Sequence, residues 1–324
     1  MKKKKCLPLQ MLKNMTTKYP DAWDIIETTR KERGKKSIIW EGTVPNWPDW
    51  CYIPMGYCMS IASTQEKDMV RQVWDGALLS ALAPWRMTKE IYSFDKELAS
   101  DLYEQPLDEL PTIVFDRLPF PAIYIEAPEL ILDDELFAGF FVSREYDPRR
   151  GDIELRLTFC QNNGTCRPYY ITYDSASTIV EAVEKVLAGY GDKEDMMSMI
   201  ELCSKAMQLV LYLCTSNPEV VTTQKAVERP ISHPKDNYKE IRTWSVGVRY
   251  GAAIKRYKQA GKSHPGSHSS KRPHYRRGHF HHYWKGPRND PNKRTLEFIW
   301  VDPVLVNADK IDGQELPAVI HSVE

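Results

Sequence analysis

The sequence feature that most constrains the fold is the block Lys271–Arg288, which concentrates basic, imidazole and aromatic side chains and contains no acidic residue. Burying an uncompensated charge costs several kcal/mol, so a block of this kind does not form a hydrophobic core. We therefore expect it to lie at a surface, or around a bound anion, metal or nucleic acid. We expect the rest of the chain to form the folded scaffold that positions this block.

The charge of the chain is strongly polarised along its length. The 324 residues carry 44 basic and 44 acidic side chains, so the formal net charge is zero. The window from Lys255 to Arg294 nevertheless holds twelve Lys and Arg residues, a single acid, Asp290, and six of the eight histidines. Such asymmetry indicates an anionic partner for the C-terminal third.

Composition indicates a folded protein of the cytoplasm. A hydrophobic content of 42% in a chain of this length allows a substantial core. The seven cysteines contain no Cys-x-x-Cys pair and are typical of buried thiols in a reducing compartment. The lysine run after Met1 is not followed by an apolar segment, so we expect no signal peptide, and no apolar run reaches the length of a membrane span. We expect no cofactor.

Three runs of aromatic and branched residues predict an antiparallel β meander. They span residues 137–144, 152–160 and 167–173, and turn-forming residues lie at 147–151 and 161–164. Ile153, Leu155 and Leu157 alternate with Glu154 and Arg156, so we expect one face of the meander to be buried and the other wet. The predicted class is α+β: an antiparallel β meander with packed helices and a C-terminal basic β-hairpin.

Helices and further strands are expected around the meander. The pattern Ser63-x-x-Glu66 predicts a capped helix that ends at Pro84, and Thr178-x-x-Glu181 predicts another. The remaining expected helices span 19–33, 95–103, 192–216 and 251–259. Strands are expected at 90–94, 113–115, 122–126 and 238–248.

The basic block itself predicts the first strand of a hairpin. On such a strand His279, His281 and Tyr283 share one face, and Phe280, His282 and Trp284 share the other. A turn at 286–292 then leads to a second strand at 294–301. We predict a body at 1–217 and a basic, His/Arg-rich hairpin module at 218–324, divided within 218–234, with one continuous fold as the alternative.

A second candidate site is the segment 37–60, where aromatic residues alternate with proline and glycine. Proline removes backbone donors, so we expect an irregular segment that wraps a surface. One interpretation is a face that binds a partner polypeptide, and the other is aromatic packing beneath a loop. The candidate partner-binding residues are Trp40, Trp47, Trp50 and Tyr52.

Nucleic-acid contact, most plausibly with RNA, is the first interpretation of the basic block. Guanidinium and ammonium groups bind phosphates, and aromatic rings stack on unpaired bases. The candidate RNA- or anion-binding residues are Arg272, His274, Tyr275, Arg276, Arg277, His279, His281, Tyr283, Trp284, Lys285 and Arg288.

Three other interpretations of the block stay open. His279 and His281, with His274, offer imidazoles for a zinc ion, but the neighbouring arginines repel a cation. A histidine pair beside arginine also suits metal-free RNA cleavage, although no nucleophile motif or phosphate-binding glycine loop accompanies it. The residues can instead form a polar network that only fixes the hairpin. We predict neither an enzyme nor a metal site.

The block also resembles a known family. The run Arg-Pro-His-x-Arg-Arg-Gly-His-x-His-x-Tyr-Trp-x-Gly from Arg272 to Gly286, followed by Trp300, Pro303, Val306 and Asn307, is similar to the C-terminal signature of an anti-CRISPR family of phages and plasmids. The named member of that family acts on the type V-A CRISPR effector nuclease. Phe280 departs from the signature, where tryptophan is usual, and the turn at 287–294 is longer.

This resemblance implies an α+β inhibitor without an enzyme active site. Such an inhibitor recognises the effector polypeptide, in its nascent form, and lowers effector production through the message. The resemblance assigns no individual roles to the matching residues, which also include Pro273 and Gly278. We therefore hypothesise a cytoplasmic inhibitor encoded by a mobile element, whose front half recognises a polypeptide and whose basic hairpin engages RNA or the ribosome.

Overall fold

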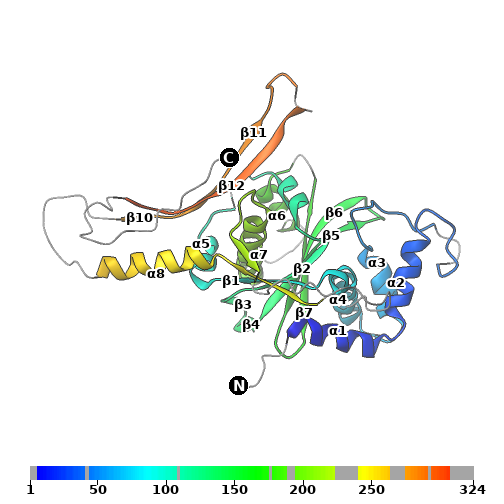
Figure 1. The fold of residues 1–324 in the computed structure, drawn as a ribbon. Coiled ribbons are helices and arrows are strands. Elements are labelled where there is room, and N and C mark those ends of the chain that lie inside the picture. The colour runs from blue at the N-terminus through cyan, green and yellow to red at the C-terminus, as the bar shows by residue number, and fades with distance from the viewer. Residues whose placement is uncertain are drawn as a thin grey trace, which may run out of the picture.

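A mixed seven-stranded sheet forms the centre of the molecule, in the strand order β7-β6-β5-β2-β1-β9-β8 (Figure 1). The computed structural model describes residues 6–40, 44–107, 110–174, 177–187, 194–222, 240–262, 274–290 and 293–306. The strands of the sheet are β1 (Glu90–Phe94), β2 (Ala122–Glu126), β5 (Gly139–Asp147), β6 (Asp152–Cys160), β7 (Cys166–Tyr173), β8 (Val220–Thr222) and β9 (Arg242–Val246).

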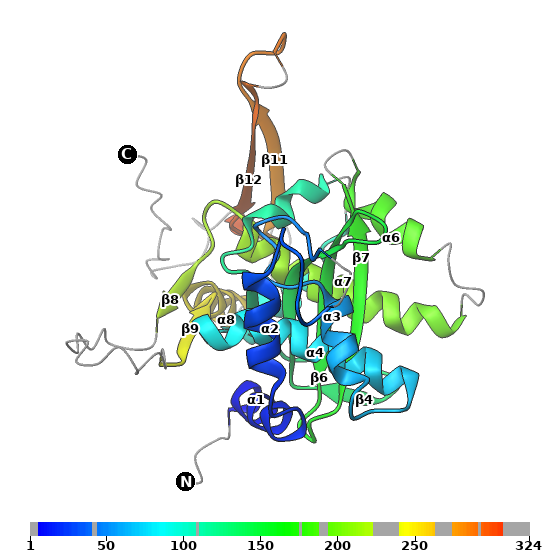
Figure 2. The ribbon, with the colours of Figure 1, turned by 90° about the vertical axis from the view of Figure 1, so that its right-hand side faces the viewer.

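Helices cover both faces of this sheet. On one face a hydrophobic cluster joins the sheet to α1 (Leu7–Lys18), α2 (Ala22–Lys31), α3 (Met55–Ala62) and α4 (Met69–Thr88). On the other face a larger cluster involves α5 (Lys96–Tyr103), the 3-10 helix η1 (Thr112–Arg117), α6 (Ile179–Leu187), α7 (Glu194–Cys214) and α8 (Val248–Lys262). The two layers lie on opposite sides of the strands in Figures 1 and 2.

The predicted α+β class and the antiparallel meander β5-β6-β7 are confirmed. The expectation of a wet meander face is wrong, because Glu154 and Arg156 are 4% and 6% exposed beneath the α3–α4 layer. The parallel pairing of β1 with β2 and β9 was also not predicted. Four of the five residues of β1 are buried, so the strand lacks the alternation that distinguishes a half-exposed strand.

Strands from both sides of the predicted division meet in one sheet. β9 follows residue 218 in the chain, yet Phe94 of β1 pairs with Val246 of β9 along a five-residue parallel register. β8 then pairs with β9 at the edge. Residues 223–239, which include most of the expected boundary, lie outside the described residues. The division into 1–217 and 218–324 stays a prediction.

The structure corrects both predicted boundaries of the fourth helix. Its N-cap is Asp68, whose carboxylate accepts a hydrogen bond from the Arg71 amide at 3.0 Å, and not Ser63, which caps the C-terminus of α3. Pro84 lies inside the helix, which continues to Thr88 and ends at the left-handed Lys89 (φ 53°). An interior proline removes one backbone hydrogen bond, and here its cost is offset by complete burial of this part of the helix.

Of the other local predictions, some are confirmed and others are wrong. The capping box at Thr178 is confirmed: its amide donates to Glu181 Oε2 at 2.7 Å, and the Glu181 amide donates to Thr178 Oγ1 at 3.2 Å. The strand expected at 113–115 is instead η1. Helices α1 and α3 were not predicted, since proline-rich flanks and weak periodicity obscure them.

Helix α7 corrects one further expectation. Its window Met197–Cys214 is long and apolar enough, by length and composition, to cross a membrane. Of that window 56% is buried inside the protein, and Leu209, Val210 and Leu211 are fully buried in the core. The helix therefore has the burial of a core helix, and its composition alone does not indicate a membrane span.

Among the described residues, three small antiparallel ladders lie outside the main sheet. They pair β3 (Leu130–Leu132) with β4 (Glu135–Phe137), β10 (His274–Arg276) with β13 (Val304–Val306), and β11 (His279–Lys285) with β12 (Thr295–Val301). The last ladder is the predicted basic hairpin, and its seven residue pairs run from His279↔Val301 to Lys285↔Thr295. It projects from the body, and the turn that joins its strands lies at the far end (Figures 1 and 2).

Candidate functional site: the basic hairpin and the aromatic segment

The base of the hairpin is part of the hydrophobic core. Leu296, Phe298 and Trp300 point to the body side of β12 and are 6%, 0% and 2% exposed. The Trp300 ring lies 5.7 Å from the ring of Tyr212 on α7 and 4.9 Å from the ring of Phe280 on β11. These contacts fix the position from which the rest of the hairpin projects.

Hydrogen bonds from the loop after α7 fix the same strand. Asn217 donates to the Trp300 carbonyl at 3.0 Å and accepts from the Trp300 amide at 3.0 Å. The Ser216 amide donates to the Phe298 carbonyl at 2.8 Å, and the Arg117 guanidinium donates to the Leu296 carbonyl. The inner edge of β12 is therefore bonded to the body rather than left open.

Gly278 allows the close approach at the base of the hairpin. A Cβ atom at this position would lie 2.4 Å from Cζ2 of Trp300, too close for any larger residue without a shift of the ring. The glycine also separates β10 from β11, so the basic block forms parts of two ladders and not one strand.

The outer part of the hairpin carries the exposed aromatic and basic groups. His281 and Tyr283 share the face that points away from the body, and their rings lie 5.7 Å apart. Tyr283 is 48% exposed and Trp284, on the opposite face, is 43% exposed. Lys285 and Arg288 are exposed at the end of β11 and in the turn. Exposed rings beside cations form a surface suited to stacking on bases and contacting phosphates.

The structure brings together only some of the predicted RNA-binding residues. Residues His279, His281, Tyr283, Trp284, Lys285 and Arg288 belong to β11 and its turn. Arg276 ends β10, and Arg277 lies 3.4 Å from Glu104 in an exposed ion pair, which contributes little to stability. His274 and Tyr275 belong to β10, which pairs with β13. Arg272 lies outside the described residues. The binding role of the whole set stays a prediction.

Within the part of the chain that the structure describes, no group of three His, Cys, Asp or Glu side chains is placed to hold a metal ion. The His279-x-His281 pair lies on one face of β11, as predicted, and its cross-strand neighbours are Val301 and Ile299. Neither neighbour supplies a ligand or a proton acceptor.

The aromatic segment, in contrast, makes extensive internal contacts. Trp47 is 5% exposed, and its indole N–H donates to the Cys51 carbonyl at 2.9 Å. The Trp40 indole donates to Thr29 Oγ1 at 2.9 Å, and its ring packs 5.3 Å from Tyr57. These rings attach the segment to α2 and α3.

The other two candidates in the segment are held by charged side chains. The Arg144 guanidinium lies 4.6 Å from the ring centre of Trp50. The Tyr52 hydroxyl donates to Glu27 Oε1 at 2.7 Å, and burial, with this bond, raises the pKa of Tyr52 to about 12. Both rings therefore take part in intramolecular packing. Partner binding by Trp40, Trp47, Trp50 and Tyr52 stays a prediction.

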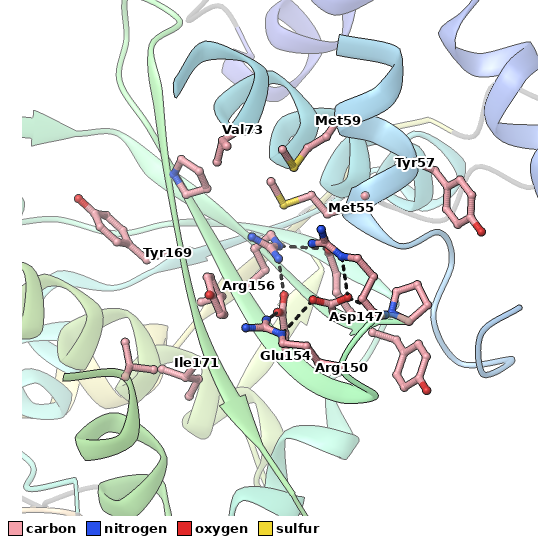
Figure 3. Close-up of a pocket in the computed structure, with 18 of the residues that line it drawn as sticks. Met55, Tyr57, Met59, Val73, Asp147, Arg150, Glu154, Arg156, Tyr169 and Ile171 are labelled. Carbon is pink, nitrogen blue, oxygen red and sulfur yellow. Dashed lines mark hydrogen bonds and ion pairs between the residues drawn. The ribbon is translucent and has the colours of Figure 1, made fainter. Parts of the chain in front are cut away.

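Sequence reasoning missed a cavity of about 620 Å³ at the β7 edge of the sheet. Side chains of α3, α4, α6 and α7 line it, together with Trp40 and the charged residues Glu145, Asp147, Glu154 and Arg156 (Figure 3). The alternation of Glu154 and Arg156 along β6 was the available signal. It was interpreted as a solvated face, whereas the structure places these charges on the floor of the cavity.

Comparison with a solved structure supports the fold. The chain is similar to the protein in the crystal structure of AcrVA2, with a TM-score of 0.65 and 20% sequence identity, over 94% of this chain and 100% of that one. At this level of identity the similarity concerns the fold alone.

Comparison with curated proteins finds Protein FinQ of Escherichia coli. It is 26% identical over 275 residues, which cover 74% of this chain and 78% of that protein.

The family comparison covers the sheet from β1 onward and both strands of the hairpin. The model of the AcrVA2-like family, described as the anti-CRISPR type V subtype A2 family, matches residues 92–308, about two thirds of the chain. Membership of this family supports an anti-CRISPR role and favours an inhibitor over an enzyme. The chain thus belongs to the AcrVA2-like anti-CRISPR family.

Proposed function

We propose that this protein suppresses a type V-A CRISPR effector nuclease in the bacterial cytoplasm by recognising the effector polypeptide during synthesis and lowering the level of its message. The observation that carries the proposal is the family match over residues 92–308, which includes the sheet from β1 onward and the hairpin. The family description supports the type of target. The route through nascent polypeptide and message is our hypothesis.

In this proposal the two parts of the molecule have different tasks. The body binds the polypeptide, and the outer hairpin contacts the phosphodiester backbone of RNA, either in the message or in the ribosome. The hairpin suits this task because its base is fixed by Trp300 and Asn217, so that the exposed rings and cations are presented on a rigid strand. Base stacking on Tyr283 and Trp284 adds affinity without demanding a sequence.

A recoding experiment tests the polypeptide step. Cells express the effector from three messages: the natural one, a synonymous recoding that keeps the protein, and a frameshifted one that keeps nearly all of the nucleotides. We expect the protein to lower the first two messages and to leave the third unchanged. Equal loss of the natural and frameshifted messages would show that nucleotides, and not the polypeptide, are recognised.

Crosslinking tests the hairpin. RNA crosslinked to the full-length protein in cells is recovered and sequenced for the natural chain, for Tyr283→Ala/Trp284→Ala, and for Lys285→Glu. Lys36→Glu, an exposed charge reversal on the body, is the matched control. We expect less RNA only from the hairpin variants, and the sequences distinguish message from ribosomal RNA. Unchanged recovery from all variants would refute the RNA contact.

A histidine-dependent RNase and a zinc-stabilised interaction module are the alternative functions. The His279-x-His281 pair is the observation that favours both. Labelled RNA incubated with the purified protein in EDTA tests the RNase, with His279→Ala and His281→Ala as controls. We expect intact RNA. Elemental analysis of the same preparation tests for zinc.

A further inference from the structure

The edge of the main sheet is bordered by a groove that the hairpin does not share. β7 is the last strand of the sheet, with α3 and α4 on one side and α6 and α7 on the other. The 620 Å³ cavity is lined by residues of all four helices and of β7 itself, so the groove follows the strand edge (Figure 3). A volume of this order accommodates several side chains of a ligand.

The walls of the groove are apolar and rich in methionine. Met55, Met59 and Val73 line it from the α3–α4 side. Methionine is unbranched and polarisable, so a wall of methionines adapts to different apolar side chains. The facing wall on α6 and α7 is formed by Val183, Val186, Met199, Ile200, Cys203 and Met207.

Exposed apolar side chains extend both walls toward solvent. Met69 and Val70, 65% and 55% exposed, lie one turn before Val73 on α4. Met197, 67% exposed, lies three residues before the wall residue Ile200 on α7, and so on the same face of the helix. Exposed apolar residues on both sides of one groove indicate a surface that a protein segment covers, because a monomer gains nothing from leaving them in water.

The charged side chains of the groove form a series of ion pairs that leads from the buried Arg156 to the exposed Arg150. Arg156 bonds Glu154 and lies 3.1 Å from Glu145, and these two acidic side chains are 5% and 4% exposed. Arg150 pairs with Glu154 at 2.9 Å and with Asp147 at 3.0 Å. Burial raises the pKa of the Glu154 carboxyl above its ordinary value.

The most exposed charged side chain at this end is Arg149, 84% exposed, which lies 3.5 Å from Asp147. Arg150, 49% exposed, pairs with Asp152 at 3.2 Å as well as with Asp147, and Asp147 beneath them is 12% exposed. Arg149 is therefore the guanidinium that the mouth of the groove presents to solvent. An acidic side chain of a ligand can bond to Arg149 without displacing the buried pair of Arg156 with Glu154. A charge-assisted hydrogen bond to arginine has roughly twice the strength of a neutral one.

The edge strand supplies the third element of recognition. The outer side of β7 has no neighbouring strand among the described residues. Pro168, which has no amide hydrogen, lies in this strand, where an edge position tolerates it. An extended peptide can add to such an edge through its main chain, while its alternate side chains enter the groove.

We propose that the β7 groove binds an extended, mostly apolar segment of a partner polypeptide that carries an acidic side chain for Arg149 and Arg150. This inference rests on the proposed recognition of a polypeptide and gives it a location. It places the principal contact with the polypeptide at the sheet edge and not in the aromatic segment. Of the four candidate partner-binding residues in that segment, Trp40 lines the groove.

Peptide display on the full-length protein tests the inference. The probe is a library of random peptides of about ten residues, the length of a long strand. We expect enrichment of peptides with alternating apolar positions and an acid near one end. Peptides that bind are then measured by fluorescence anisotropy against Met69→Glu, Met197→Glu and Arg149→Glu/Arg150→Glu. We expect at least tenfold weaker binding by each.

Matched controls use side chains that are equally exposed but lie away from the groove. Ile131→Glu on β3 replaces an apolar side chain that is 48% exposed, and Lys13→Glu reverses an exposed charge on α1. Both should bind the peptide as the natural chain does. Equal weakening by groove and control variants, or a library without enrichment, would overturn the groove assignment.

A cellular readout separates this inference from the proposed function. Groove variants that still lower the effector message as the natural chain does would refute the groove and leave the function standing. Conversely, groove-dependent peptide binding by a protein that never lowers the effector message would support the groove and refute the function.

Discussion

The hairpin and the β7 groove use the same residue types in opposite ways. On the hairpin, basic and aromatic side chains project from a narrow ladder whose base alone is buried. In the groove, Arg156 lies beneath helices with two carboxylates, and the apolar side chains form the walls. The number of charges in a segment therefore does not locate a binding site. What matters is whether the fold pairs each charge internally or turns it outward.

The base and the end of the hairpin should respond very differently to loss of an indole. Trp300→Ala removes a buried ring that contacts Tyr212, Tyr250 and Phe280, so we expect a loss of about 3–5 kcal/mol in the free energy of unfolding. Trp284→Ala, at a 43% exposed position, should change it by less than about 0.5 kcal/mol. Denaturant titration measures both. Similar losses would mean that the hairpin has no anchored base.

An arginine of the groove should matter more for stability than an arginine of the hairpin. Arg156→Met leaves Glu145 and Glu154 buried without their shared counter-ion, and we expect a loss of about 3 kcal/mol. Arg288→Met, at an exposed site in the turn, should leave the unfolding free energy nearly unchanged. Restoration of stability by adding Glu145→Gln/Glu154→Gln to Arg156→Met would confirm the cause. No recovery would contradict it.

A single methyl group tests the packing between the basic block and the core. Gly278→Ala places Cβ 2.4 Å from Cζ2 of Trp300, so the ring must shift, and we expect a loss of about 1–3 kcal/mol. The control is Gly56→Ala, because a Cβ atom there meets no other atom within 4 Å. Thermal unfolding compares the two. If Gly278→Ala leaves thermal unfolding unchanged, the Trp300 ring can shift without a loss of stability.

Alkaline pH should destabilise the body through its buried thiols. Burial raises the pKa of the thiols of Cys166 and Cys214 from 9.0 to about 12. These two thiols therefore ionise at lower pH in the unfolded chain than in the folded one. Their contribution to stability is fully present below pH 9 and is lost as the pH rises from 9 to about 12. Each thiol contributes a loss of about 1.4 kcal/mol per pH unit. Cys166→Ala/Cys214→Ala should reduce the slope of this dependence, and the buried thiols of Cys51, Cys58, Cys160 and Cys203 should retain the rest, in denaturant titrations at pH 8 to 10.

The sequence was most informative where one face of an element meets water. Alternation along β12 predicted the hairpin, and the turn residues at 161–164 predicted the β6–β7 connection. Prediction from the sequence failed where both faces of a strand are covered. β1 shows no alternation, and Glu154 on β6 is buried by helices whose position no local pattern encodes. The groove could not be predicted for the same reason, because it is formed by side chains from helices more than a hundred residues apart.

The parallel pairing of β1 with β9 sets a condition on when the molecule can become active. Glu90 is bonded in register with Arg242, so β1 lacks one of its two neighbouring strands until a partner about 150 residues later is made. At typical rates of synthesis this interval is roughly 8–30 s. Until then the apolar edge of β1 is open to chaperones, proteases and other chains. Pairing over so long a separation is also slow to form. A ribosome that stops before residue 240 therefore releases a chain that cannot complete its seven-stranded sheet, and the folded protein is available only once β9 has been made.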